Sequence, residues 1–241
     1  MQSIDRNILK VVCQECEKEH LPGAQILPSA DAEWTQGCQI CAEQKEGEIV
    51  FWTEDGIFAR QSEVCLTPKE VFRYTFSGNA PVIVTKKTID GERAFVENAD
   101  TVKVADAYEG KISFQLCDDE AIYGLGQQEN GVYNYRNVKE YLYQNNMKIP
   151  MPVILSSRHY AILFDAGCMF TYEEKNGIMT FTFDAVDDLT YYVIKGSCMD
   201  ELVKGIRTLT GKAVMLPKWA FGYVQSKERY KTQEEILTTA E

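Results

Sequence analysis

The sequence predicts a mostly β protein, in which a large antiparallel β-sandwich is followed by a helix and the first β/α unit of a second domain. Short runs of β-branched and aromatic residues, separated by turn residues, fill most of the chain before Ser197. A helical apolar pattern then begins at Met199, and an apolar run and a capped helix come after it. We therefore expect a sandwich over residues 1–198, a connecting helix over 199–212 and the β/α unit over 213–241.

The sandwich should hold about a dozen strands with short loops between them. Residues 48–60 form two expected strands joined at Asp55-Gly56, a dipeptide that suits tight hairpins because it tolerates positive φ. Other segments show the alternation or the apolar runs typical of strands. These expected strands are residues 8–13, 71–76, 80–86, 111–116, 153–157, 160–165, 179–184 and 189–194.

The last part of the chain changes from β-type to mixed patterning. Residues 216–224 are an apolar run after a proline and predict a strand, and Thr232 with Glu235 predicts a capping box that opens a helix. A strand, a loop and a capped helix are what the start of a β/α barrel would contain. In the connecting helix, Gly211 can serve as the terminator. The residues expected on its apolar face are Met199, Leu202, Val203, Ile206 and Leu209.

Composition excludes some classes of partner. The net charge of −11 disfavours nucleic acid and anionic membranes, which would be repelled, and it suits a neutral substrate such as a sugar. No segment approaches the roughly 20 apolar residues that a membrane helix requires. The N-terminus lacks a basic run followed by an apolar core, so no secretory signal is visible and we expect a cytoplasmic protein.

The eight cysteines include two CxxC pairs, Cys13 with Cys16 and Cys38 with Cys41. Their spacing resembles that of a four-thiolate zinc site. The first pair, however, continues an apolar run that predicts a strand. Reduced strand cysteines are therefore our interpretation, and structural zinc is the alternative.

Motifs of common catalytic sites are missing from the sequence. It has no nucleophile elbow, zinc-protease helix, Walker loop or dinucleotide fingerprint. Two isolated histidines, His20 and His159, are more typical of surface or core positions than of ligands. The Gly124-Leu125-Gly126 segment lacks the third glycine and the following helix of a phosphate-binding loop.

The carboxylates also suggest no catalytic pair. A glycosidase needs two carboxyl groups about 5 Å apart for retention, or about 6.5–9.5 Å apart for inversion. Residues 118–120 and 187–188 are acidic clusters between expected strands, where solvated turns explain them, and Asp184 can cap a turn. From the residues alone we assign no catalytic group.

Three ordered segments resemble glycoside hydrolase family 31. Residues 122–136, which begin Ile-Tyr-Gly-Leu-Gly-Gln, resemble a stretch of that family's N-terminal β-sandwich. Residues 144–165 look like the next segment, a polar loop that leads into a strand pair, and residues 209–237 resemble the junction into the catalytic barrel. The resemblance implies a galactose-mutarotase-like sandwich packed against a (β/α)8 barrel, of which this chain holds only the truncated start.

The family's chemistry is retaining hydrolysis, or sometimes transfer, of α-linked glucosides or xylosides of oligosaccharides. The resemblance places the two catalytic aspartates on later barrel strands, beyond Glu241, so it implies that this chain alone is inactive. It implies no cofactor and no metal. The amino-acid sequence of residues 225–230, together with Gln127, Gln128 and residues 134–136, looks more like that of the α-xylosidase-type members than that of the mammalian-type α-glucosidases.

Two segments match family regions that face the sugar. In relatives, a sandwich loop reaches over the barrel mouth, and the residues after the first barrel strand line the pocket. Ordinary structural roles are the alternatives: a polar turn before Pro150, and a salt-linked loop before the last helix. The candidate substrate-binding residues are Gln144, Asn145, Asn146 and Lys148 in the first segment, and Lys227, Glu228, Arg229 and Tyr230 in the second.

Two hypotheses from other classes stay open at this point. One is a free-standing carbohydrate-binding or scaffolding sandwich with no catalytic role. The other is a binding module that zinc holds together through the two CxxC pairs. The sequence also leaves homo-oligomer formation open.

Overall fold

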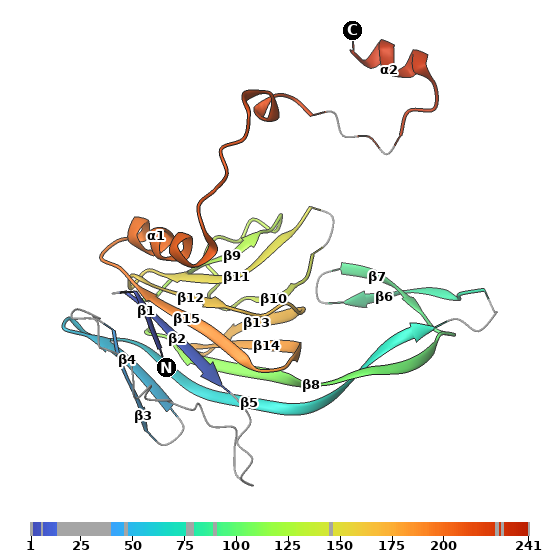
Figure 1. The fold of residues 1–241 in the computed structure, drawn as a ribbon. Helices are drawn as coiled ribbons and strands as arrows, with labels where there is room; N and C mark the ends of the chain where they lie inside the picture. Colours follow the sequence, from blue (N-terminus) through green and yellow to red (C-terminus); the bar gives the residue numbers. More distant parts are fainter. Residues whose placement is uncertain are drawn as a thin grey trace. The chain divides into compact units, whose positions relative to one another are not determined.

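The computed structural model describes residues 2–5, 7–13, 40–45, 48–75, 80–88, 91–144, 147–224, 227 and 229–240. The chain divides into two compact units, Met1–Leu209 and Thr210–Glu241. The first unit holds all of the described strands, and every described pair of neighbouring strands is antiparallel (Figure 1). The predicted mostly β, antiparallel fold is therefore confirmed.

Two large sheets form the body of this unit. The six-stranded sheet has the order β1-β2-β15-β12-β11-β9, and the seven-stranded sheet has the order β10-β13-β14-β8-β5-β4-β3. A separate two-stranded sheet pairs β6 with β7. The strands of the first sheet are β1 (Gln2–Asp5), β2 (Ile8–Cys13), β9 (Ile122–Gln127), β11 (Ile149–Ser156), β12 (Tyr160–Phe164) and β15 (Leu189–Lys195). Those of the second are β3 (Cys41–Lys45), β4 (Glu48–Thr53), β5 (Gly56–Thr75), β8 (Asp100–Gln115), β10 (Lys139–Leu142), β13 (Phe170–Lys175) and β14 (Ile178–Val186), and the hairpin is β6 (Ile83–Thr88) with β7 (Gly91–Val96).

The core lies between the two large sheets and is rich in aromatic rings. Phe164 of β12 packs on Phe181 of β14 with ring centroids 4.5 Å apart. Tyr191 of β15 meets Phe114 of β8 edge to face at 5.8 Å. Alternate residues along β14 are buried, as expected for strands with one face in a core. Burial of these large rings is the main stabilising contribution to the sandwich.

The predicted hairpin at residues 48–60 is present, with its turn displaced by one residue. Thr53 pairs with Gly56, so Glu54 and Asp55 form the turn and Gly56 starts β5 at a φ of 111°. Residues 71–75 and 111–115 of two other expected strands are parts of the much longer β5 and β8. These two pair from Arg60 with Gln115 to Thr75 with Asp100, with irregularities in the register on the way.

Helix α1 (Met199–Thr210) begins where the sequence predicts it and packs on the six-stranded sheet. Leu202 is fully buried in a cluster with Ile8, Ala161 and Ile194. Gly211, with a φ of 83°, follows the last residue of the helix, as expected. Val203 was expected on the same face but is 49% exposed, because it is one residue beyond Leu202 on the helix and so faces away from the sheet. The other apolar residues of the predicted face, Met199, Ile206 and Leu209, do pack against this cluster.

The second unit departs from the predicted β/α unit. Residues 216–224 contain a 3₁₀ helix, η1 (Lys218–Phe221), where a strand was expected. Its turns are closed by bonds from Ala220 N to Pro217 O (2.9 Å) and from Gly222 N to Trp219 O (3.1 Å). A strand needs a neighbour for its backbone groups, and in the described part of this unit no strand is available to pair with it. Whether these residues open a barrel stays a prediction.

Helix α2 (Gln233–Ala240) confirms the predicted capping residues. The Thr232 hydroxyl accepts a hydrogen bond from Glu235 N at 3.2 Å. The reciprocal bond comes from Lys231 N to the Glu235 carboxylate at 2.7 Å, one residue before the usual donor. Neither helix, nor any other helix in the described ranges, is long and apolar enough to span a membrane.

Candidate functional site

The predicted sugar-facing residues fall in different units of the chain. Gln144 and Lys148 belong to the first unit, and Lys227, Arg229 and Tyr230 belong to the second. Asn145, Asn146 and Glu228 lie outside the described residues. The two segments are therefore described separately.

The first segment connects β10 to β11. We call Tyr141 of β10, together with Tyr143, Gln144 and Lys148 of the connection, the rim segment. The Gln144 side-chain amide donates to Lys148 O at 2.7 Å, which ties the two ends of the segment together. The Lys148 ammonium lies 5.8 Å from the centre of the Tyr143 ring. The Gln144 amide and the tyrosine phenols can both donate to and accept from sugar hydroxyl groups, and the Lys148 ammonium can donate to them. The rim segment thus has the chemistry needed to bind a sugar.

Sequence reasoning missed the residue that packs on this segment. Arg93 of β7 places its guanidinium 3.4 Å from the centre of the Tyr143 ring and 4.8 Å from that of Tyr141. The two tyrosine rings are 5.3 Å apart. Nothing in the local sequence around Arg93 indicates this contact, because its partners are about 50 residues away along the chain.

The second segment is organised around one cation–π contact. The Lys227 ammonium lies 4.3 Å from the centre of the Tyr230 ring. The Tyr230 side chain is half-buried, whereas Arg229 is exposed. These contacts are local to the second unit and fit both the sugar-binding prediction and the alternative of a loop that precedes α2.

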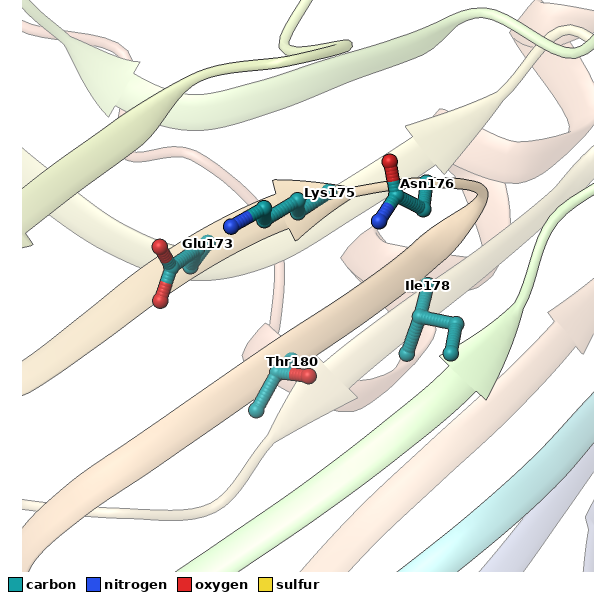
Figure 2. A pocket seen from close by; sticks show the side chains of 5 residues that line it. All are labelled: Glu173, Lys175, Asn176, Ile178 and Thr180. Carbon is teal, nitrogen blue, oxygen red and sulfur yellow. The ribbon is translucent and has the colours of Figure 1, made fainter.

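A shallow groove runs along the outer face of the seven-stranded sheet, with a volume of about 330 Å³. Figure 2 shows Glu173 and Lys175 on β13, Ile178 and Thr180 on β14, and Asn176 at the turn between them. Two of its polar groups already have protein partners: Glu173 pairs with Lys139 at 3.2 Å, and Thr180 bonds with Ser113 at 2.9 Å. This groove is a weaker candidate for ligand binding than the rim segment.

A second cavity of about 370 Å³ lies where β15 leads into α1. Lys195 lines it and donates to Arg158 O and Gly196 O, both at 3.2 Å. Burial lowers the pKa of Lys195 from its ordinary value. Glu201 accepts a bond from Ser197 N at 2.7 Å, which lowers the pKa of that carboxyl. These charged groups are engaged in holding the start of α1.

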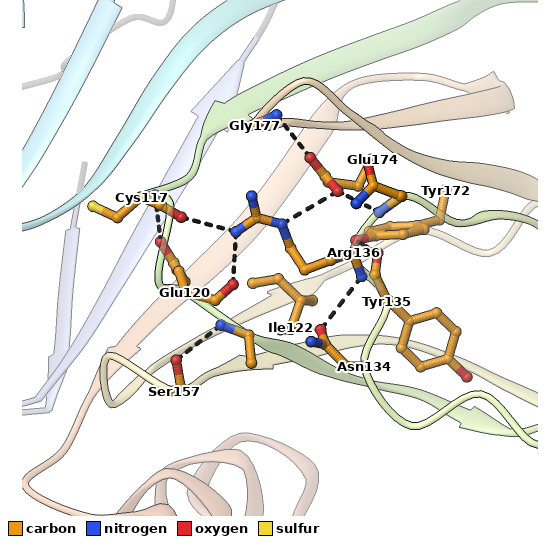
Figure 3. A network of polar contacts seen from close by, with 12 residues as sticks. Cys117, Glu120, Ile122, Asn134, Tyr135, Arg136, Ser157, Tyr172, Glu174 and Gly177 are labelled. Carbon is orange, nitrogen blue, oxygen red and sulfur yellow. Dashed lines mark hydrogen bonds and ion pairs between the residues drawn. The ribbon is translucent and has the colours of Figure 1, made fainter.

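Among the described residues of the first unit, two carboxylates are buried, and both belong to a polar network around Arg136 (Figure 3). Arg136 donates to Cys117 O at 2.8 Å and to Glu120 O at 2.6 Å, and its Nε lies 3.2 Å from Glu174. Glu174 also accepts from the backbone N–H groups of Asn137 and Gly177. Each part of this network is bonded to backbone, so it fixes the loop between β9 and β10.

Glu120 corrects a prediction made from the sequence. The acidic cluster at residues 118–120 was expected to be a solvated turn, yet Glu120 is only 3% exposed. Its carboxylate accepts bonds from Ser156 Oγ at 2.5 Å and from Cys117 N at 3.0 Å. Burial, with the nearby Glu120 charge, raises the pKa of Tyr160 well above its ordinary value. Because these carboxylates are held by protein donors, the network supports structure rather than catalysis.

The Gly124-Leu125-Gly126 segment has a structural role and is not a phosphate-binding loop. All three residues have positive φ, at 111°, 60° and 86°. A Cβ on Gly126 would lie 1.9 Å from Ile149 O. The glycines therefore allow β9 to approach β11 where the register of that pair is irregular.

The alternative of a zinc site at the two CxxC pairs falls partly outside the described residues. Cys16 and Cys38 lie outside the described residues, whereas Cys13 is buried and Cys41 is half-buried. Burial raises the pKa of the Cys13 thiol to about 12, which disfavours the thiolate that a metal would need. Within the described ranges, no three His, Cys, Asp or Glu side chains form a group that could hold a metal ion.

Comparisons by sequence and by structure both find α-xylosidases that are similar to this chain. No family model matches the sequence. The α-xylosidase of Saccharolobus solfataricus is 39% identical over 140 residues, which cover 54% of this chain and 19% of that enzyme. The α-xylosidase A of Aspergillus niger is 29% identical over 136 residues, which cover 56% of this chain and 18% of that enzyme. The match thus spans about a fifth of the length of these relatives.

Solved structures extend the likeness in fold to nearly the whole chain. A family 31 α-xylosidase from a soil metagenome, complexed with xylose, matches with a TM-score of 0.61 and 20% identity, over 97% of this chain and 35% of that one. A family 31 α-xylosidase from Xanthomonas citri matches with a TM-score of 0.55 and 15% identity, over 98% of this chain and 41% of that one. The predicted resemblance is thus confirmed: in sequence over about half of its length, and in fold over nearly all of it, this chain matches glycoside hydrolase family 31 enzymes of the α-xylosidase and α-glucosidase type.

Proposed function

We propose that this chain is the N-terminal region of a retaining α-glycosidase that removes α-linked xylosyl or glucosyl units from oligosaccharides. The 39% identity to an α-xylosidase carries this proposal, because it extends over 140 residues of the chain. In this proposal the first unit supports the substrate pocket, and the second unit leads into the catalytic barrel. The catalytic carboxylates come from residues outside this chain.

The described carboxylates support the last point. The two buried ones, Glu120 and Glu174, accept bonds from backbone or side-chain donors. A nucleophile and a general acid would instead face a common cavity about 5 Å apart. We therefore expect the purified chain to release no p-nitrophenol from its α-xyloside or α-glucoside. Turnover above the rate in buffer would contradict this part of the proposal.

A chimera tests the supporting role directly. The N-terminal region of the Saccharolobus solfataricus α-xylosidase would be replaced by the matching part of this chain, and α-xyloside hydrolysis would be measured. Hydrolysis by the chimera is expected, since the proposed role of this region is to support a pocket that the barrel completes. A matched chimera carrying Gly126→Val should lose activity, because the side chain cannot fit against Ile149 O.

The rim segment supports the substrate-facing part of the proposal. Gln144→Ala and Lys148→Ala in the active chimera should raise KM for oligosaccharides more than they lower kcat, because these residues would bind the sugar rather than the reacting bond. An inactive but folded chimera, together with micromolar oligosaccharide binding by the isolated chain, would instead favour a free-standing carbohydrate-binding sandwich.

A further inference from the structure

The β6–β7 hairpin is a two-stranded sheet of its own, yet one of its side chains reaches the rim segment. Arg93 projects from β7 and its guanidinium stacks 3.4 Å from the Tyr143 ring centre and 4.8 Å from the Tyr141 ring centre. Figure 1 shows β7 on the side of the sandwich where β10 ends. A two-stranded hairpin is marginal alone, so contacts of this kind fix its place.

A second cation on the hairpin contacts different partners from those of Arg93. Lys86 of β6 lies 5.6 Å from the Phe95 ring centre and 3.4 Å from the Glu97 carboxylate. Both partners of Lys86 are on or beside the hairpin itself. Arg93 instead bridges two parts of the first unit that are far apart in sequence.

The contact with Tyr143 extends to the polar residues that follow it. Lys148 lies 5.8 Å from the face of the same ring, and the Gln144 amide donates to Lys148 O at 2.7 Å. On the other side, the Tyr141 hydroxyl donates to Met169 Sδ at 3.5 Å. A change in the Tyr143 rotamer would therefore alter the positions of Gln144 and Lys148.

We infer that Arg93 is a positioning residue: by stacking on Tyr141 and Tyr143 it holds Gln144 and Lys148 in the geometry that recognises the sugar. This inference rests on the proposed function for its substrate class. The planar guanidinium is essential to it, because a flat group can stack on a ring over its whole face, whereas an ammonium acts as a point charge. Arg93 itself need not touch the sugar.

The test uses the 241-residue chain labelled with ¹³C at its methionine methyl groups. Met147 is an exposed reporter between Gln144 and Lys148, and Met169 reports on Tyr141. Without any sugar, Arg93→Ala and Arg93→Lys should both shift these two methyl signals, with the larger shift for alanine. Lys86 is the direct cross-strand partner of Arg93, so the matched control is Lys87→Ala, an exposed cation on the opposite face of the same hairpin, which should leave both signals in place.

A second arm adds a disaccharide that carries an α-linked xylosyl unit on glucose. In the wild-type chain this probe should shift the Met147 signal, and Arg93→Ala should weaken the apparent affinity about three- to tenfold, the range of one cation–π contact. Arg93→Lys should recover only part of that loss, and Lys87→Ala should bind as the wild type does.

The two arms separate the failure of the inference from the failure of the proposed function. Unchanged Met147 and Met169 signals in Arg93→Ala would overturn the positioning role, whatever the sugar does. No response of wild-type Met147 to the disaccharide at millimolar concentration would overturn the sugar-recognition role in this chain, whereas the activity of the chimera decides the proposed function separately. The fully buried Met179 methyl reports on the packing of the core. If its signal shifts in Arg93→Ala, the core of that variant is perturbed, and the Arg93→Lys variant then tests the inference.

Discussion

Arg136 Nε lies 3.2 Å from the Glu174 carboxylate, whose side chain is only 1% exposed. This pair connects the loop after β9 to the hairpin of β13 and β14. Its geometry suggests that the loop is fixed from the inside of the sandwich rather than by surface contacts.

Removing one partner of this buried pair should cost far more than removing a surface pair. Arg136→Met leaves the Glu174 charge buried with fewer donors and should lower the free energy of unfolding by about 3–5 kcal/mol. Lys139→Ala, which breaks the exposed pair with Glu173, should change it by less than about 1 kcal/mol. Urea unfolding of both variants measures this, and equal costs would show that the Arg136 network adds little.

Alanine substitutions at two glycines with positive φ distinguish the cost of a steric clash from the cost of backbone strain. Gly126→Ala places a Cβ 1.9 Å from Ile149 O, whereas Gly131→Ala, at a φ of 71°, meets nothing within 4 Å. We expect Gly131→Ala to cost about 1–2 kcal/mol from backbone strain alone. Gly126→Ala should cost clearly more and should weaken amide protection in β9 and β11. A Gly126→Ala chain as stable as Gly131→Ala would contradict the close approach of these strands.

Neighbouring residues on α1 test the corrected helix face. Leu202 is fully buried against the six-stranded sheet, and Val203 is 49% exposed. Leu202→Ala should therefore lower the free energy of unfolding by about 2–5 kcal/mol, because it leaves a cavity. Val203→Ala should change it by about 0.5 kcal/mol or less. Thermal unfolding followed by circular dichroism compares them, and a larger loss for Val203→Ala would restore the face predicted from the sequence.

The buried Cys13 thiol predicts a loss of stability at alkaline pH. Burial raises its pKa from 9.0 to about 12, so between these values the folded chain keeps a proton that the unfolded chain releases. The free energy of unfolding should then fall with rising pH, by about 1.4 kcal/mol per pH unit for this one group. Cys13→Ala should flatten this slope between pH 9 and pH 10, relative to the wild type in the same buffer series.

Alkylation gives an independent check on the same thiol. Iodoacetamide at pH 8 should modify the exposed Cys117 and Cys198 well before Cys13, because only the thiolate reacts. Peptide mapping by mass spectrometry separates these sites. Equal rates at Cys13 and Cys117 would show that β2 is not buried between its neighbours.

Strands with one face in the core were the part of the fold that the sequence predicted well. Alternation along residues 179–184 gave the correct face because Met179, Phe181 and Phe183 all point into the core. Extended strands without that pattern were underestimated. The outer half of β5 has mixed exposure and includes Pro68, so the short pattern at residues 71–76 gave no sign of a 20-residue strand.

Burial of charge was the feature that the sequence could not supply. Glu120 follows two exposed aspartates, and only its tertiary partner Ser156 distinguishes it from them. The same reason hid Arg93, whose role depends on a ring about 50 residues away. Residues 216–224 were apolar enough for a strand, but in the described part of the second unit they have no strand to pair with, and Pro217 starts a 3₁₀ turn instead.

Strand β2 pairs with β15 along its whole length, from Ile8 with Ile194 to Cys13 with Leu189. Strand β2 therefore acquires this neighbour only after about 180 further residues have been synthesised. Contacts of such long sequence separation are slow to form and leave apolar edges uncovered in the meantime. The six-stranded sheet therefore cannot close until β15 has been synthesised. Chaperones that shield apolar segments during translation should raise the yield of folded protein.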